Sequence, residues 1–366
     1  MFHTIKKDSP HKGTKYEYND EYRLDSLKDK RKWISMTWLY VTEPGLRVTK
    51  NGGHIVLIQE NEVVCKIPSE TVEGVTVIDS VQVSSAVISF LLLKKVPVTW
   101  LSSGGKYFGR LESTQSHDVF CQKEQFDLLA DTEFCLLLAK KVINCKIYNQ
   151  RTVLRNYNRR AKLDSVVELY QKIKYLSEKI DGAETVEVIM GYEGSIARNY
   201  FQALGQLVPE DFHFDTRTKQ PPRDRFNAML SFGYTLLLYD FYTAIQNTGL
   251  HPYIGFLHAL KNGHPALASD LMEPWRAAIV DSLCLSLINH NEIKPGSFTQ
   301  SPEGGTYLDR MGRKIFIREY ERKMKSVNSY FGGQYSWRHT IQMECDSYRL
   351  AIHRKDIEAL KPLVTR

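Results

Sequence analysis

Residues 38–78, WLYVTEPGLRVTKNGGHIVLIQENEVVCKIPSETVEGVTVI, decide the fold of the first part of the chain, because runs of β-branched and aromatic residues alternate there with turn residues. Turn signals such as Lys50-Asn51-Gly52-Gly53 and Glu60-Asn61 separate the runs. The tight spacing favours antiparallel hairpins over βαβ units. One more run, VPVTWL (96–101), follows a short helical segment, SSAVISFLLLKK (84–95). We therefore predict a small antiparallel β domain over residues 34–112.

After Gly109-Arg110-Leu111 the strand pattern ends, and apolar residues recur at helical spacing to the end of the chain. The predicted fold is therefore α+β: a small N-terminal antiparallel β domain, a linker at 113–122 and a larger all-α domain at 123–366. Residues 1–33 are dense in charge and are expected to form an extension outside both domains.

The composition, 366 residues of which 42% are apolar, is that of a globular protein with a sizeable core. A net charge of +7 favours an anionic partner without identifying it. The 6 cysteines include no Cys-x-x-Cys pair, which argues against zinc-ribbon and thioredoxin-like sites. The N-terminus has no apolar signal segment, and the most apolar run, VSSAVISFLLL (83–93), is too short to cross a bilayer. We expect a cytoplasmic protein without a membrane partner.

Two acids stand in an apolar segment, ALASDLMEPWRAAIV (266–280), where Asp270 and Glu273 are three residues apart and share one helix face. Carboxylates are almost never fully buried without a partner. A structural interpretation is as plausible from this segment alone: Asp270 caps a helix, and Glu273 pairs with Arg276. The alternative is a functional site built on both acids.

A histidine and a third acid lie on other apolar stripes. We expect His258 to end a helix with Ile254 and Leu257 on its inner face, and a short loop to turn the chain back toward Asp270. A lone histidine on such a face is more often a satisfied core residue. Glu193 lies on the same stripe as Ile196, although a first-turn glutamate also favours the helix dipole.

Together, Glu193, His258, Asp270 and Glu273 offer up to three carboxylates, one imidazole and no thiolate. Such an oxygen-rich set suits hard divalent ions, Mg²⁺ or Mn²⁺, more than zinc or copper. These ions serve phosphoryl transfer, because they align the attacking oxygen and stabilise the leaving one. We therefore expect a bound metal to be the partner of the acids.

Residues 140–162, KKVINCKIYNQRTVLRNYNRRAK, carry many positive charges and no acid. Arg151, Arg155 and Arg159 follow one another at four-residue spacing and form one stripe of a helix. Basic stripes with tyrosines among them suit a nucleic-acid backbone, whereas a merely solvated face usually carries acids as well. The residues predicted to bind nucleic acid are Lys146, Arg151, Arg155, Arg159 and Arg160. A second basic cluster, in DRMGRKIFIREYERKMK (309–325), is interrupted by acids and is a weaker candidate.

Over roughly residues 36–345 the chain resembles the CRISPR-associated protein one family, the integrases of spacer acquisition. The resemblance is carried by the β-rich run that starts at VTEPGLRVTKNGGHIVLIQ and by the order and spacing of five further blocks: GYEGSIARNYFQAL, PPRDRFNAMLSFGYTLL, TGLHPYIGFLH, ASDLMEPWR and YLDRMGRKIFIREYE. It implies metal ligands at Glu193, His258 and Glu273, with Asp270 as a further acidic position that orients the metal shell or relays a proton.

The resemblance also implies the reaction and the partners. The 3′-hydroxyl of a short double-stranded DNA attacks a phosphodiester at the edge of a CRISPR repeat, and water in its place cleaves DNA. The implied partners are a second copy of the chain, bound through the β domain, and the small ferredoxin-like CRISPR-associated protein two. Two alternatives stay open: a stand-alone metal-dependent nuclease in repair or RNA processing, and a non-catalytic nucleic-acid-binding protein in which the four residues form a structural cluster.

Overall fold

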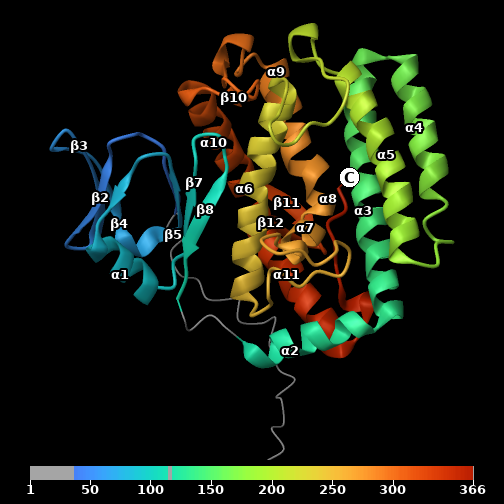
Figure 1. Cartoon of the computed structure of the whole chain (residues 1–366), viewed down its shortest axis with the longest axis horizontal. Coiled ribbons are helices and arrows are strands. Elements are labelled where there is room, and N and C mark those ends of the chain that lie inside the picture. Colours follow the sequence, from blue (N-terminus) through green and yellow to red (C-terminus); the bar gives the residue numbers. More distant parts are fainter. Residues whose placement is uncertain (1–36, 114–117, 366) are drawn as a thin grey trace, which may run out of the picture. The chain divides into compact units, whose positions relative to one another are not determined.

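The computed structural model describes residues 37–113 and 118–365, with strands at the start and helices after them (Figure 1). Two four-stranded sheets form the β part. The first has the order β1 (Thr37–Val41), β5 (Val72–Ile78), β7 (Val98–Leu101) and β8 (Tyr107–Leu111). The second has the order β4 (Glu62–Pro68), β3 (His54–Gln59), β2 (Arg47–Asn51) and β6 (Gln82–Val83). Helix α1 (Ser85–Leu93) joins β6 to β7 along the chain.

The sheets are mixed, so the prediction of purely antiparallel hairpins is wrong in part. Strands β2, β3 and β4 form the expected antiparallel pairs, as do β7 and β8. However, β5 pairs in parallel with both β1 and β7, and β6 with β2. The connection from β5 to β7 contains α1 and exceeds the dozen residues that a parallel crossover requires. Val87 and Leu91 of α1 are buried with the strand residues, so this helix covers the β core as a βαβ crossover does.

The rest of the described chain is mainly helical. Its longer helices are α2 (Val119–Asp127), α3 (Thr132–Ala161), α4 (Asp164–Ser177), α5 (Val186–Gln206), α6 (Arg225–Asn247), α9 (Ser282–Asn289), α10 (Arg310–Lys325) and α11 (Trp337–Arg354). Two short helices, α7 (Ala266–Leu271) and α8 (Glu273–Trp275), lead into a π-helical turn, Arg276–Asp281. Short 3₁₀ turns stand at 69–71, 128–130, 210–212, 295–297 and 357–359.

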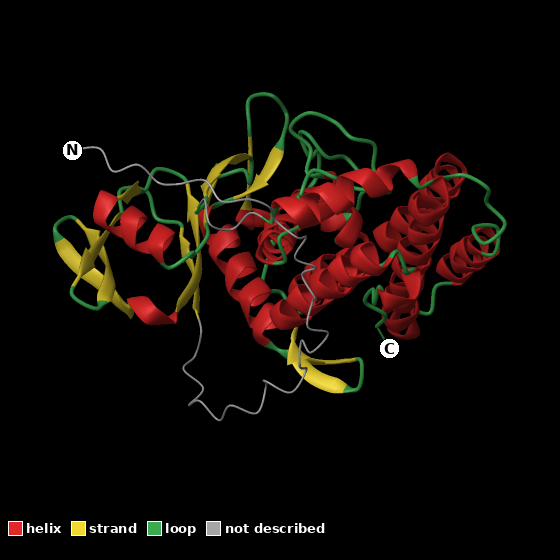
Figure 2. Cartoon of the chain, turned by 90° about the horizontal axis from the view of Figure 1, so that it is seen from below, coloured by secondary structure: helices red, strands yellow, loops and turns green. Residues whose placement is uncertain are grey.

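Two hairpins interrupt this part, as Figure 2 shows, so it is not all-α as predicted. Strand β9 (Phe298–Gln300) pairs with β10 (Thr306–Leu308), and β11 (Val327–Tyr330) pairs with β12 (Gly333–Ser336). The broader α+β prediction is confirmed, because strands dominate the first part of the chain and helices the second. The boundaries near residues 33, 112 and 122 stay predictions, and residues 1–36 and 114–117 lie outside the described ones.

Polar caps fix where the helices that carry the site begin. The side chains of Asp131, Thr185 and Asp224 accept hydrogen bonds from backbone N–H groups in the first turns of α3, α5 and α6. Helix α3 runs through 30 residues and packs against both α5 and the α8 turn. Its buried Asn149 donates to the Pro274 carbonyl at 2.7 Å, so α3 holds the backbone beside Glu273 directly.

Candidate active site

Four segments bring charged side chains to one place. Glu193 comes from α5, His258 from the segment before α7, Glu273 from the start of α8, and Lys146 from the middle of α3. Asp270 of α7 contacts the Nδ1 atom of His258. The structure therefore gathers the four residues predicted from the sequence. Beside them lies Lys146, which we predicted to bind nucleic acid.

Lys146 lies between the two glutamates and is buried. Its Nζ atom is 2.5 Å from Glu193 Oε1 and 2.6 Å from Glu273 Oε2, with 9% of the lysine side chain exposed. Burial lowers the pKa of Lys146, but the two carboxylates outweigh it, so the pKa lies above its ordinary value. This position differs from the predicted one on a DNA-facing stripe, because the helix turns Lys146 inward toward acids supplied by other helices.

Glu273 is surrounded by cations. Besides Lys146, the Arg276 Nε atom lies 3.3 Å from Glu273 Oε1, and His258 Nε2 lies 3.8 Å from the same oxygen. Burial raises the pKa of Glu273, yet Arg276, Lys146 and His258 together lower it to about 2. Lys146 thus lies against Glu273 Oε2, while Arg276 and His258 lie on the side of Oε1. Glu273 is therefore ionised, and side-chain cations surround it.

Asp270 is fully buried and satisfied by fixed donors. Its Oδ2 accepts from the backbone N–H groups of Phe256 at 2.7 Å and Leu257 at 3.0 Å, and its Oδ1 accepts from the backbone N–H of His258 at 3.0 Å. The His258 ring adds a contact of 2.6 Å from Nδ1 to Oδ1. With every oxygen occupied in this way, Asp270 positions other groups and has no free face for a metal.

These contacts correct the prediction that His258 ends a helix. Residues 251–265 contain no helix, and the N–H groups of Phe256, Leu257 and His258 bond to Asp270 and not to carbonyls one turn earlier. Gly255 permits the approach, since a Cβ there would lie 2.6 Å from Asp270 Oδ2 and 2.7 Å from the Ala266 carbonyl carbon. The first helix of the predicted pair is thus a loop around a carboxylate, whereas the second is present as α7.

The bond to Asp270 also fixes the histidine ring. When Nδ1 donates to a carboxylate, Nε2 is the nitrogen left to accept or to bind a metal. In His258 that nitrogen points to the side of Glu273. Burial lowers the pKa of His258, but Asp270 and Glu273 outweigh it and raise the pKa above its ordinary value.

The donor set fits a hard divalent ion on one condition. In the part of the chain that the structure describes, no three His, Cys, Asp or Glu side chains are gathered closely enough to hold a metal as they stand. Between Glu193 and Glu273 the position is taken by the Lys146 ammonium, which shows that it suits a cation. Two carboxylates and an imidazole nitrogen match the preferences of Mg²⁺ and Mn²⁺. The residues therefore fit the metal if the ammonium moves.

Sequence reasoning missed Arg217. The Tyr234 ring contacts two guanidinium groups, that of Arg276 at 4.9 Å and that of Arg217 at 5.4 Å from its centroid. Its hydroxyl donates to Asp281 at 2.5 Å, and burial raises the pKa of that acid to about 6. Arg276 was visible in the sequence as a partner of Glu273, whereas no local pattern pointed to Arg217. Cations held this way suit the binding of phosphate.

The predicted basic stripe divides along α3. Arg155, Arg159 and Arg160 are exposed, as the stripe requires. Arg151 is half-buried instead, donates to the Tyr170 hydroxyl at 3.1 Å and lies over the Tyr170 ring. In the second basic cluster, Arg318 and Arg322 both pair with Glu319 of the same helix, which explains why that cluster was the weaker one.

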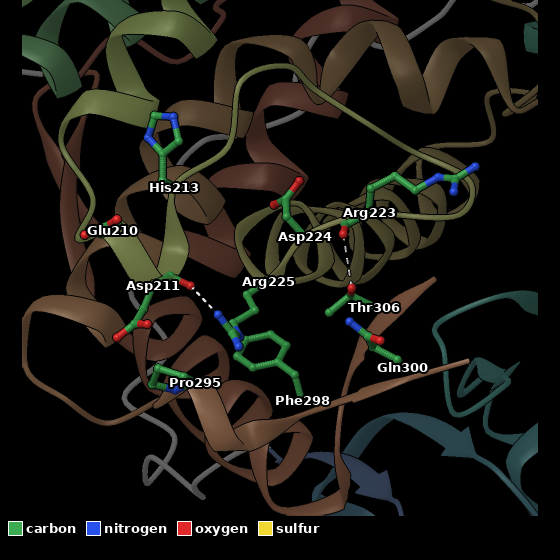
Figure 3. Close-up of a pocket in the computed structure, with 10 residues that line it drawn as sticks. All are labelled: Glu210, Asp211, His213, Arg223, Asp224, Arg225, Pro295, Phe298, Gln300 and Thr306. Carbon is green, nitrogen blue, oxygen red and sulfur yellow. Dashed lines mark hydrogen bonds between the residues drawn. The ribbon is translucent and has the colours of Figure 1, made fainter. Parts of the chain in front are cut away.

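A separate cavity of about 460 Å³ lies elsewhere, and Figure 3 shows the side chains around it. Arg225 donates there to the Asp211 carbonyl at 2.7 Å, and Thr306 donates to the Arg223 carbonyl at 3.3 Å. The lining mixes acids with arginines and includes none of the residues around Lys146. We therefore keep this cavity apart from the candidate site.

A family model described as "CRISPR associated protein Cas1" matches residues 39–322. The chain belongs to the Cas1 family. It is 30% identical to the CRISPR-associated endonuclease Cas1 of Mycobacterium tuberculosis, over 85% of this chain and 93% of that protein. It is 35% identical to the Cas4/endonuclease Cas1 fusion of Geobacter sulfurreducens over 84% of its own length, and spans 56% of that longer relative.

Solved structures agree with the family assignment. A chain of a Cas6-RT-Cas1–Cas2 complex superimposes with a TM-score of 0.80 at 25% identity, covering 91% of this chain and 36% of that one. A Cas1 protein from Thermotoga maritima shares the fold with a TM-score of 0.75 at 24% identity, covering 87% and 97%. A casposase bound to an integration product gives a TM-score of 0.76 at 24% identity, covering 87% and 91%. The two curated relatives are both named as Cas1 endonucleases.

Within residues 37–113 and 118–365, no helix is both long enough and apolar enough to cross a membrane.

Proposed function

We propose that this chain is a divalent-metal-dependent DNA integrase and endonuclease of CRISPR spacer acquisition. The observation that carries the proposal is that Glu193 and Glu273 face one buried position, which the Lys146 ammonium fills, while His258 Nε2 lies 3.8 Å from Glu273 Oε1. A cluster kept only for structure has no need for two buried glutamates facing the same point, because removing charge from a core is often neutral or stabilising.

In the proposed reaction the 3′-hydroxyl of a short double-stranded DNA attacks a phosphodiester at the edge of a CRISPR repeat. A new 3′-oxygen–phosphorus bond forms, the old bond to the repeat's own oxygen breaks, and that oxygen leaves as a hydroxyl after taking up a proton. With water as the nucleophile the same site cleaves DNA. Mg²⁺ or Mn²⁺, held by Glu193, His258 Nε2 and Glu273, would activate the attacking oxygen and offset charge on the phosphate.

The remaining residues prepare that site. Asp270 holds the His258 ring through Nδ1 and fixes the loop backbone through three N–H groups. Arg276, held on Tyr234, keeps Glu273 ionised and offers a guanidinium to a phosphate oxygen. Arg155, Arg159 and Arg160 of α3 present exposed charge to the DNA backbone and read no bases.

The proposed partners are a second copy of this chain and Cas2, the small ferredoxin-like protein, in the cytoplasm. Strand β4 stands at the edge of its sheet and carries exposed Val63 and Val64, so the β part offers backbone groups and apolar surface to another chain. Among the solved relatives, one is named as part of a complex with Cas2, and the casposase is bound to an integration product. These names support Cas2 and DNA as partners.

A joining assay tests the proposal. The purified chain and Cas2 are incubated with a labelled DNA duplex and a repeat-bearing plasmid, in Mg²⁺, Mn²⁺ or EDTA. Glu193→Gln and Glu273→Gln keep the shape of the side chains and remove the charge, so we expect joining to fall at least about 100-fold while DNA binding persists. Lys123→Gln on α2 is the matched surface control.

Each other outcome points to a specific alternative. Metal-dependent cleavage without joining, even with Cas2 and repeat DNA present, would replace the integrase with a stand-alone nuclease. DNA binding without any metal-dependent chemistry in the unmodified protein would leave a binding protein in which the four residues are structural.

A further inference from the structure

We propose that Lys146 is an internal cation that the catalytic metal must displace, and that the displaced ammonium then pairs with a phosphate of the DNA. This inference deepens the proposed function and rests on it. Its consequence is that metal and DNA bind cooperatively, because metal frees a positive charge that only an anionic ligand can take up.

The first step is steric and electrostatic. Lys146 Nζ lies within 2.6 Å of an oxygen from each glutamate, so it uses oxygens that a metal ligated by the same two side chains would need. A divalent ion and an ammonium cannot both lie against the same pair of carboxylates without strong repulsion. Metal binding at Glu193 and Glu273 therefore requires the ammonium to leave.

Before the metal binds, the ammonium holds the two glutamates in place. Glu193 and Glu273 come from different helices, and both are largely buried, with 15% and 7% of their side chains exposed. Two such carboxylates repel each other when no cation stands between them. Lys146 thus keeps the two glutamates facing one point, so the site is organised before the metal arrives.

The third step is where the ammonium goes. The charged groups that act on Lys146 most strongly are Glu273, Glu193 and Arg276. Once a metal has neutralised the glutamates, the remaining charges that act on Lys146 are those of Arg276 and Lys219, and both are positive. A phosphodiester entering the site is the anion that this group of cations lacks, and a flexible lysine side chain reaches it without moving α3.

The test measures metal binding without catalysis. Mn²⁺ affinity is determined by calorimetry and by electron paramagnetic resonance of free Mn²⁺, on the intact chain without DNA. Lys146→Met preserves most of the side-chain volume and removes the competitor, so we expect the Kd for Mn²⁺ to fall about tenfold or more. We also expect a short DNA duplex to tighten Mn²⁺ binding to the unmodified chain, and to do so far less in the Lys146→Met variant.

A lysine control separates displacement from a general change of charge. Lys141→Met removes a positive charge from the same helix, at a residue paired with the exposed Glu358. We expect less than about a threefold change in the Kd for Mn²⁺, because a charge that does not touch the carboxylates is screened by water.

Two further variants test the site itself. Glu193→Gln and Glu273→Gln should each weaken Mn²⁺ binding, and if neither does, the proposed metal site fails and this inference falls with it. If they do weaken it, while Lys146→Met binds Mn²⁺ no more tightly than the unmodified chain, only the displacement is wrong.

Acylation of lysines in the unmodified chain, followed by mass spectrometry, gives an answer even if the Lys146→Met variant does not fold. The buried Lys146 should be protected in EDTA and become reactive with saturating Mn²⁺ in the absence of DNA. Protection that saturating Mn²⁺ leaves unchanged would overturn the proposal.

Discussion

Asp270 and Glu273 stand three residues apart, both buried and both acidic, yet the structure treats them in opposite ways. Asp270 is surrounded by backbone N–H groups and the nitrogen of a histidine ring. Glu273 is surrounded by the side-chain cations Lys146, Arg276 and His258. Backbone donors are fixed by the fold, whereas a lysine ammonium on four methylene groups can leave.

This difference gives a physical basis for the two roles that the family resemblance implies, a metal ligand at Glu273 and a further acidic position at Asp270. A carboxylate whose partners cannot move shapes the loop and orients His258. A carboxylate whose partners can move is able to exchange one cation for another. We therefore interpret Asp270 as a positioning residue and Glu273 as a metal ligand, and the predictions below test that distinction.

The largest expected effect follows the loss of Asp270. In Asp270→Ala, three backbone N–H groups and the His258 ring lose their acceptor, and each unsatisfied buried donor costs about 1–3 kcal/mol. We expect the free energy of unfolding to fall by roughly 4–6 kcal/mol, measured by guanidinium unfolding in EDTA. In Glu273→Gln the expected loss is smaller, roughly 3 kcal/mol, because the variant removes the charge whose pKa the cations lower to about 2 but keeps an oxygen near Arg276.

Equal losses in the two variants would contradict the distinction between fixed and movable partners. Asp270→Asn sharpens the test, because it preserves the size of the side chain but turns an N–H group toward the backbone donors. It should therefore fail to recover most of the stability.

The same distinction explains what the sequence did and did not reveal. Acids on apolar stripes are visible one by one, so Glu193, Asp270 and Glu273 could be selected from local patterns and from the family resemblance. The conformation of residues 251–265 could not, because its donors are satisfied by Asp270, 12 to 14 residues further along the chain. Apolar periodicity predicts segments whose backbone groups bond to each other within a helix. Here the Asp270 side chain accepts three of the N–H groups instead.

The inward position of Lys146 and the parallel strand pairs could not be predicted, for a related reason. In a run of basic residues without acids, an inward-facing lysine looks like its exposed neighbours, and its partners lie 47 or more residues away. The strands themselves were evident from composition. Whether β5 and β7 pair in parallel depends on the path of the connection between them, which contains α1. Both facts belong to tertiary structure, which local propensity does not encode.

Glu344 is a further buried acid, and its surroundings differ from those of both Asp270 and Glu273. Glu344 accepts from Trp275 Nε1 at 2.7 Å and from the Leu363 N–H at 3.0 Å. Burial without a charged partner raises its pKa from 4.5 to about 8, whereas cations lower that of Glu273 to about 2. The folded protein thus keeps the Glu344 proton up to about pH 8, while the unfolded chain releases it near 4.5.

The sign of the pH effect follows. Between about pH 4.5 and 8 the folded state binds more protons than the unfolded state at this residue, so its contribution to stability is lost as pH rises through that window. Glu344→Gln removes the titration and keeps an oxygen for Trp275. We expect the variant to exceed the unmodified chain by roughly 4–5 kcal/mol above pH 8, and to match it near pH 4.5. Unfolding free energies measured across that window would refute this if the difference stayed constant.

The smallest expected effects belong to α3, where the comparison between paired and exposed charge repeats along one helix. Lys146 is buried against two acids, whereas Arg155 and Arg159 are exposed two and three turns later. If these arginines bind DNA phosphates, Arg155→Gln and Arg159→Gln should each weaken duplex binding only a few-fold. Each should also lower the slope of log affinity against log salt by about 0.9, equally for any DNA sequence. Lys123→Gln should leave the slope unchanged, and an unchanged slope in the arginine variants would mean that the stripe is only a solvated face, so that the DNA path must follow other cations.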